Sequence, residues 1–158
     1  MNFPLRSNTQ MMSKFAIAAL LSTASATSWA GCDHGSKTLF SCTTSSVEQI
    51  ELCDAGAKIQ YSFGKVHAKP DLVLSVPRSQ ASTYQWQGFG RDHTYSVHVP
   101  NGKTAYEVFN SDDALDPKHA LNAGVNVLVN GDRVATVQCS PKYPVINHLV
   151  DVDLKPSE

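Results

Sequence analysis

Apolar and polar residues alternate along most of this chain, and this period of two constrains the fold more than any other feature. Ile59, Tyr61 and Phe63, for example, are separated by single polar residues, which is typical of a strand with one buried face. Comparable alternation or short apolar runs are found at 38–44, 50–53, 72–76, 84–87, 95–99, 106–109, 125–129 and 134–139. The sequence therefore predicts about eight short β-strands.

The segments between these strands are short and rich in turn residues. Asn101-Gly102 and Asn130-Gly131 are dipeptides favoured in two-residue type I′ hairpins, because both central positions of such a turn need positive φ. Hairpins join neighbouring antiparallel strands. The pattern indicates an all-β fold, either a single antiparallel β-sandwich or a flattened barrel.

One segment, residues 111–124, is expected to contain a short helical turn. Asp116 would cap it, Pro117 suits its first position, and Gly124 suits its exit. The rest of the predicted domain is strand and loop.

The first thirty residues differ from the remainder. They contain Arg6 and Lys14 but no acidic residue, then an apolar run at 15–21, and they end in Ser28-Trp29-Ala30. A basic start, an apolar middle and small residues before a cleavage point define a secretory signal peptide. The apolar run is shorter than the roughly 20 residues that a membrane span needs. We expect a signal peptide at 1–30, a single β domain at 31–158, and a periplasmic location.

All four cysteines, Cys32, Cys42, Cys53 and Cys139, follow residue 30. An even number of cysteines in an exported chain predicts two disulfides, with three possible connectivities. We expect Cys42–Cys53 to close the first hairpin and Cys32–Cys139 to tie the N-terminal arm to the last strand. Cys32 is also where a bacterial lipoprotein would carry its lipid, but that anchor would leave an odd number of cysteines, which favours the unlipidated form.

Charge and motifs exclude several functions. Removing residues 1–30 takes away two of the 13 basic residues and none of the 14 acidic ones, which leaves 11 basic residues and a net charge of −3. This charge argues against a nucleic-acid partner.

His93 and His98 are five residues apart and would face opposite sides of a strand, so we expect no metal site. No nucleophile-elbow or phosphate-loop pattern is present, and we expect neither a cofactor nor an enzymatic activity.

Two surfaces are candidates for binding. The first is the predicted hairpin with Asn101, Gly102, Lys103 and Tyr106. The alternative consists of Tyr84, Trp86 and Arg91, where two aromatic rings alternate on one strand before a glycine-rich turn. Either surface would make this chain a binding protein.

The chain resembles the small periplasmic lysozyme inhibitors of Gram-negative bacteria, nearest the type directed against invertebrate lysozymes. The resemblance extends over the domain and rests on the following features: Cys42 and Cys53, Tyr61-Ser62-Phe63-Gly64, Trp86-Gln87-Gly88, the Asn101-Gly102 hairpin leading to Tyr106, and Cys139. Such inhibitors look like antiparallel β-sandwiches that insert one loop into the lysozyme cleft through a Ser-Gly pair followed by Tyr.

Carried over to this chain, the resemblance implies that Gly102 matches the family's glycine. Asn101 takes the position of the serine, and Tyr106 that of the tyrosine at a slightly different spacing. It implies a lysozyme as the protein partner. The alternatives are a glycan- or small-ligand-binding module that uses Tyr84, Trp86 and Arg91, or a structural envelope protein.

Overall fold

The alternating segments form strands, as the sequence predicts. The computed structural model describes residues 32, 33, 35–118, 120 and 122–157; the predicted signal peptide lies outside the described residues. The strands are β1 (Lys37–Thr43), β2 (Glu48–Asp54), β3 (Lys58–Lys65), β4 (Leu72–Pro77), β5 (Ser82–Gln85), β6 (Asp92–Asn101), β7 (Thr104–Asp113), β8 (Asn122–Val129), β9 (Asp132–Gln138), β10 (Ile146–Asn147) and β11 (Lys155–Pro156).

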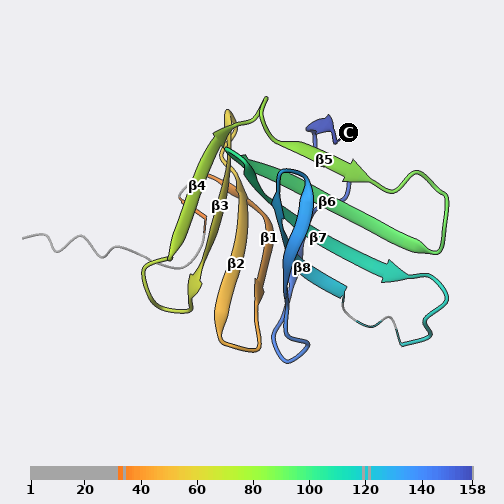
Figure 1. The fold of residues 1–158 in the computed structure, drawn as a ribbon. Coiled ribbons are helices and arrows are strands. Elements are labelled where there is room, and N and C mark those ends of the chain that lie inside the picture. The colour runs from red at the N-terminus through yellow and green to blue at the C-terminus, as the bar shows by residue number, and fades with distance from the viewer. Residues whose placement is uncertain (1–31, 34, 119, 121, 158) are drawn as a thin grey trace, which may run out of the picture.

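These strands form two sheets that pack face to face as a β-sandwich. The first sheet has five strands in the order β10-β1-β2-β3-β4, and the second has six in the order β11-β5-β6-β7-β8-β9. Most neighbours are consecutive in the chain and antiparallel, because short turns join them. Figure 1 shows the two layers, with the second sheet reaching beyond the first at the end where the β5–β6 and β7–β8 loops lie.

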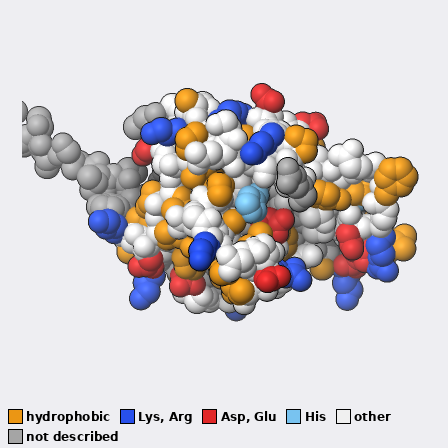
Figure 2. All heavy atoms as spheres, turned by 45° about the horizontal axis from the view of Figure 1, so that its top comes forward, with side chains coloured by type: hydrophobic (Ala, Val, Ile, Leu, Met, Phe, Trp, Pro, Cys, Tyr) orange, Lys and Arg blue, Asp and Glu red, His pale blue; other side chains and the backbone are white. Residues whose placement is uncertain are grey.

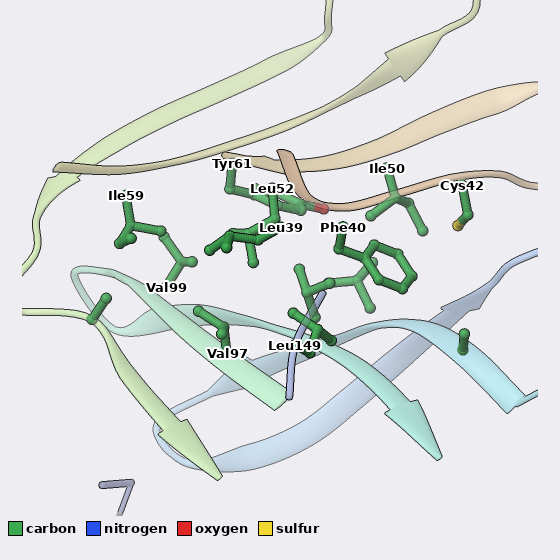
Figure 3. Packing of buried hydrophobic residues seen from close by; sticks show 14 of the residues in the cluster. Leu39, Phe40, Cys42, Ile50, Leu52, Ile59, Tyr61, Val97, Val99 and Leu149 are labelled. Carbon is green, nitrogen blue, oxygen red and sulfur yellow. The ribbon is translucent and has the colours of Figure 1, made fainter. Parts of the chain in front are cut away.

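The core consists of the inward residues of both sheets. Phe40, Ile50 and Leu52 from the first sheet are fully buried, as are Val97 and Val99 from the second. Figure 3 shows these side chains pointing toward one another between the layers. The alternation predicted at 59–63 and 95–99 is therefore confirmed as an inward face.

The predicted disulfide pairing is wrong. Cys42 is bonded to Cys139, and Cys32 is bonded to Cys53. The register explains the difference, because Cys42 lies opposite Ile50 on the inward face, and Cys53, three residues beyond Ile50, points to the outer face of the same sheet. Two cysteines on opposite faces cannot form a bridge.

The predicted helical turn is also wrong. Between Ser111 and Gly124 the residues that the structure describes contain strand and turn but no helix. β7 continues to Asp113 because it pairs with the first residues of β6. The backbone N–H groups of Lys118 and Ala120 donate to the carboxylate of Asp116, so this residue caps a turn rather than a helix.

The segment after β9 connects the two sheets. β10 pairs with β1, and β11 pairs with β5 in parallel. Between them, Leu149 is fully buried in the core. The guanidinium of Arg78 donates to the backbone oxygen of Asp153 at 2.9 and 3.1 Å, which fixes this segment to the end of β4.

Candidate functional site

The turn between β6 and β7 is built from Gly102 and Lys103. Asn101 pairs with Thr104 and belongs to the ladder, so the turn lies one residue later than the Asn-Gly dipeptide predicted. Gly102 has a φ of 64°, whereas Asn101 does not have positive φ. A glycine with positive φ at the first central position is typical of a type II′ turn, which also suits a two-residue hairpin.

The hairpin between β8 and β9 has the predicted geometry. Asn130 and Gly131 have φ values of 53° and 90°, and the flanking Val129 pairs with Asp132. These values match a type I′ turn at this dipeptide. The two hairpin turns are neighbours, because the backbone N–H of Asn130 donates to the backbone oxygen of Lys103 at 2.8 Å.

The β6–β7 turn is exposed to solvent. Asn101, Gly102 and Lys103 are all exposed, and a Cβ atom added at Gly102 would meet no atom within 4 Å. The hydrogen bond from Asn130 and the ladder that follows hold the turn in place. The structure thus brings together three of the four predicted hairpin residues at one tip.

Tyr106 does not lie at this tip. Its side chain faces the core, and its ring stacks on that of Tyr61 with ring centroids 5.0 Å apart. Burial raises the pKa of the Tyr61 hydroxyl, and the neighbouring Tyr106 hydroxyl raises it further. Tyr106 is half-buried, and it therefore joins the two sheets beneath the turn instead of extending the exposed surface.

Two of the three alternative binding residues, Trp86 and Arg91, are hydrogen-bonded within the domain. Arg91 is engaged in two hydrogen bonds with Asp113, and these bonds hold the pKa of Asp113 below its usual value. The indole N–H of Trp86 donates to the backbone oxygen of Phe89 at 2.8 Å, and its ring lies 4.0 Å from that of His93. Tyr84 is the member of this set with an exposed ring, at 44%.

The sequence analysis did not predict that the β5–β6 and β7–β8 loops, at one end of the molecule, expose large hydrophobic side chains. Phe89 in the β5–β6 loop is 85% exposed, and Leu115 in the β7–β8 loop is 72% exposed. Figure 2 shows hydrophobic, acidic and basic side chains close together where this end stands out from the body. The glycine-rich sequence around Phe89 indicated a turn but not the exposure of its aromatic ring.

Three residues with atoms of the kind that bind metals lie at the Cys32–Cys53 disulfide. Within the described part of the chain, Cys32, Glu51 and Cys53 bring their ligand atoms within 4.8 Å of one another. The two sulfurs are joined in the disulfide, and a disulfide sulfur is not the thiolate that zinc requires.

The raised pKa of Glu51 makes the stability of the folded protein depend on pH. Burial raises its pKa, and the charge of Asp33 raises it further, while a backbone hydrogen bond at Cys32 opposes both. The folded protein therefore holds this proton more tightly than the unfolded chain. The resulting stability is present at acidic pH and is lost as the pH rises through the raised pKa. We expect Glu51→Gln to remove this loss.

The measurement is the melting temperature of both proteins at about pH 4 and pH 7, values on either side of an ordinary glutamate's pKa. The variant should gain melting temperature over the parent at the higher pH. Asp132→Asn, which removes an exposed carboxylate, is the control and should not. Parallel pH curves for the parent and Glu51→Gln would show that another group titrates.

Three comparisons were made, with models of protein families, with curated proteins and with solved structures, and none found a match for this chain. Among the described residues there is no helix with the length and apolar character needed to cross a membrane. The two disulfides indicate folding in an oxidising, exported compartment.

Proposed function

We propose that this chain is a periplasmic inhibitor of a lysozyme, exported by a signal peptide at residues 1–30, and that it places the β6–β7 turn in the enzyme's active-site cleft. One observation carries the proposal. The turn is exposed at Asn101, Gly102 and Lys103, yet the hydrogen bond from Asn130 to the oxygen of Lys103 fixes its position. A surface that is already ordered loses less entropy on binding.

The chemistry of the turn supports the same target. A glycoside hydrolase cleft holds two carboxyl groups that act as acid and as nucleophile or base. Lys103 offers a cation and Asn101 an amide N–H, and hydrogen bonds to an ionised carboxylate are stronger than neutral ones. Gly102 has no side chain, which keeps the tip narrow enough to enter a cleft. No catalytic activity of this chain itself is part of the proposal.

The role of Tyr106 differs from the one that the family resemblance implies. Because its ring stacks on Tyr61 between the sheets, we assign it to support of the turn. Any direct contact with the enzyme would come from the tip, and Asn101 there replaces the hydroxyl of the family's serine with an amide.

The test is inhibition of cell-wall lysis. The chain, purified from the periplasm of an expression host, is titrated into invertebrate-type, chicken-type and goose-type lysozymes. We expect it to inhibit at least one of them. Lys103→Glu should weaken that inhibition by about tenfold or more, because it exchanges an attractive charge for a repulsive one.

Lys65→Glu is the matched control. It makes the same change of charge at an exposed residue, but at the last residue of β3. Figure 3 places Ile59, near the start of β3, beside Val99, near the turn, so Lys65 lies toward the other end of the sandwich. We expect the control to inhibit like the parent. Absence of inhibition of all three enzymes at large molar excess, or equal potency of Lys103→Glu and the parent, would overturn the proposal.

A further inference from the structure

The outer face of the second sheet contains a polar depression. Its volume is about 550 Å³, which lies within the range of small-molecule sites. It is lined by Thr94, Glu107, Phe109, Ser111, Asn122, Asn126, Arg133, Thr136 and Gln138. All of them except Phe109 carry polar side chains. This face points away from the core, because the alternate residues of the same strands, such as Val97 and Val108, are fully buried inside.

A chain of hydrogen bonds orders the floor of the depression. The Asn126 side-chain N–H donates to Glu107 Oε2 at 2.9 Å, and the Ser96 hydroxyl donates to Glu107 Oε1 at 3.2 Å. The Thr136 hydroxyl donates to Asn126 Oδ1 at 2.7 Å. These bonds link strands β6 to β9 side by side and fix the orientation of the carboxylate and the amide. Each carboxylate oxygen keeps a further lone pair with which to accept from a ligand.

Gly124 lets β9 approach β8 closely beside the floor. It lies between Phe109 on β7 and Gln138 on β9 in the register. A Cβ at this position would lie 2.2 Å from the backbone oxygen of Val137, so no side chain can occupy the place. Phe109, opposite Gly124 in the register, is buried and is the aromatic residue of the lining.

Three groups around the floor are free to contact a ligand. Arg133, Asn122 and Gln138 are exposed, and none of their side chains has a hydrogen bond or ion pair with another described residue. Arg133 is the cation among the lining residues.

We propose that this depression binds a short oligosaccharide and that Arg133 receives a carboxylate of that sugar chain. A sugar hydroxyl both donates and accepts, and it therefore suits a floor that presents a fixed carboxylate next to amide and hydroxyl groups. An apolar ligand would leave Arg133, Asn122 and Gln138 without partners, which carries a desolvation cost. The guanidinium fork of Arg133 matches a carboxylate in two parallel hydrogen bonds.

This site is separate from the β6–β7 turn, and the proposal does not depend on inhibition of a lysozyme. The test is titration of the isotope-labelled protein, purified from the periplasm, with three trisaccharides while backbone amide signals are followed. The probes are trigalacturonate, which carries carboxylates, galactotriose, its neutral counterpart, and chitotriose. We expect trigalacturonate to bind most tightly and to shift the amide signals of Glu107, Asn126, Arg133 and Thr136.

Arg133→Gln should weaken trigalacturonate binding by about tenfold, the effect of losing one charge-assisted pair. Arg133 is exposed at the edge strand, so the variant should fold like the parent. Lys142→Gln, which removes an exposed cation that does not line the depression, is the control and should bind like the parent. The proposal is overturned if none of the three sugars shifts the lining residues, if galactotriose binds as tightly as trigalacturonate, or if Arg133→Gln binds trigalacturonate unchanged.

Discussion

Replacing Cys42 and Cys139 together by alanine is expected to lower the free energy of unfolding by about 4–5 kcal/mol, because their disulfide closes a loop with a sequence separation of 97 residues. The bond restricts the unfolded chain over most of the domain. In the folded state it joins β1 to the end of β9, and both side chains are buried. Changing both cysteines avoids a lone reactive thiol.

The matched variant removes Cys32 and Cys53, whose bond spans a separation of 21 residues and should contribute about 3 kcal/mol. Urea unfolding of the two double variants and the parent measures the difference. The Cys42/Cys139 variant should have the lower midpoint. If instead the Cys32/Cys53 variant were the less stable, loop length would not be the main source of the stabilisation, and the disulfide beside Glu51 would contribute more than its separation indicates.

Gly124→Ala is expected to destabilise the protein by about 3 kcal/mol, at the upper end of the usual cost of an overpacked site. The new methyl carbon would lie 2.2 Å from the oxygen of Val137, and 3.0 and 3.1 Å from two further backbone atoms of β9. Backbone atoms cannot move aside as the end of a long side chain can. β8 and β9 would have to separate at this point, and Thr136 on β9 would move away from Asn126.

Gly56→Ala is the control for the loss of glycine freedom. Gly56 has a φ of 71°, and a Cβ there meets no atom within 4 Å, so its substitution should carry only the strain of a left-handed residue, about 1 kcal/mol. The melting temperatures and amide spectra of both variants are measured. The difference between them separates the effect of the steric collision at Gly124 from the effect of placing alanine in a left-handed backbone conformation at Gly56. Equal melting temperatures for the two variants would contradict the expected collision at β9.

The period of two was sufficient to predict the fold class. It identified strands as far apart as β3 and β8, since one face of each must be buried whatever its neighbours are. It could not identify the cysteine partners, because these depend on which face of β2 carries Cys53. It could not predict the end of β7 either, since pairing with β6 outweighs the local preference of Pro117 for a helical turn.

The candidate site was predicted less completely. The Asn-Gly dipeptide located the β6–β7 hairpin but placed its centre one residue early. In the observed register, Val97 lies opposite Val108, so two fully buried valines meet in the core, and this packing fixes the turn at Gly102 and Lys103. The polar depression has a partial sequence signal, since Glu107 in β7 and Asn126 in β8 each lie between apolar residues. The close approach of β9 to Gly124 beside it has no local sequence signal.

The C-terminal segment has a consequence for the order in which the molecule can be assembled. β1 is among the first strands to be synthesised, yet its outer neighbour is β10, which is among the last. Leu149 likewise fills the core only once almost the whole chain has been made. Until then β1 has an open edge and the interior lacks a side chain. Synthesis from the N-terminus therefore cannot yield a finished sandwich step by step, and closure waits for β10 and Leu149.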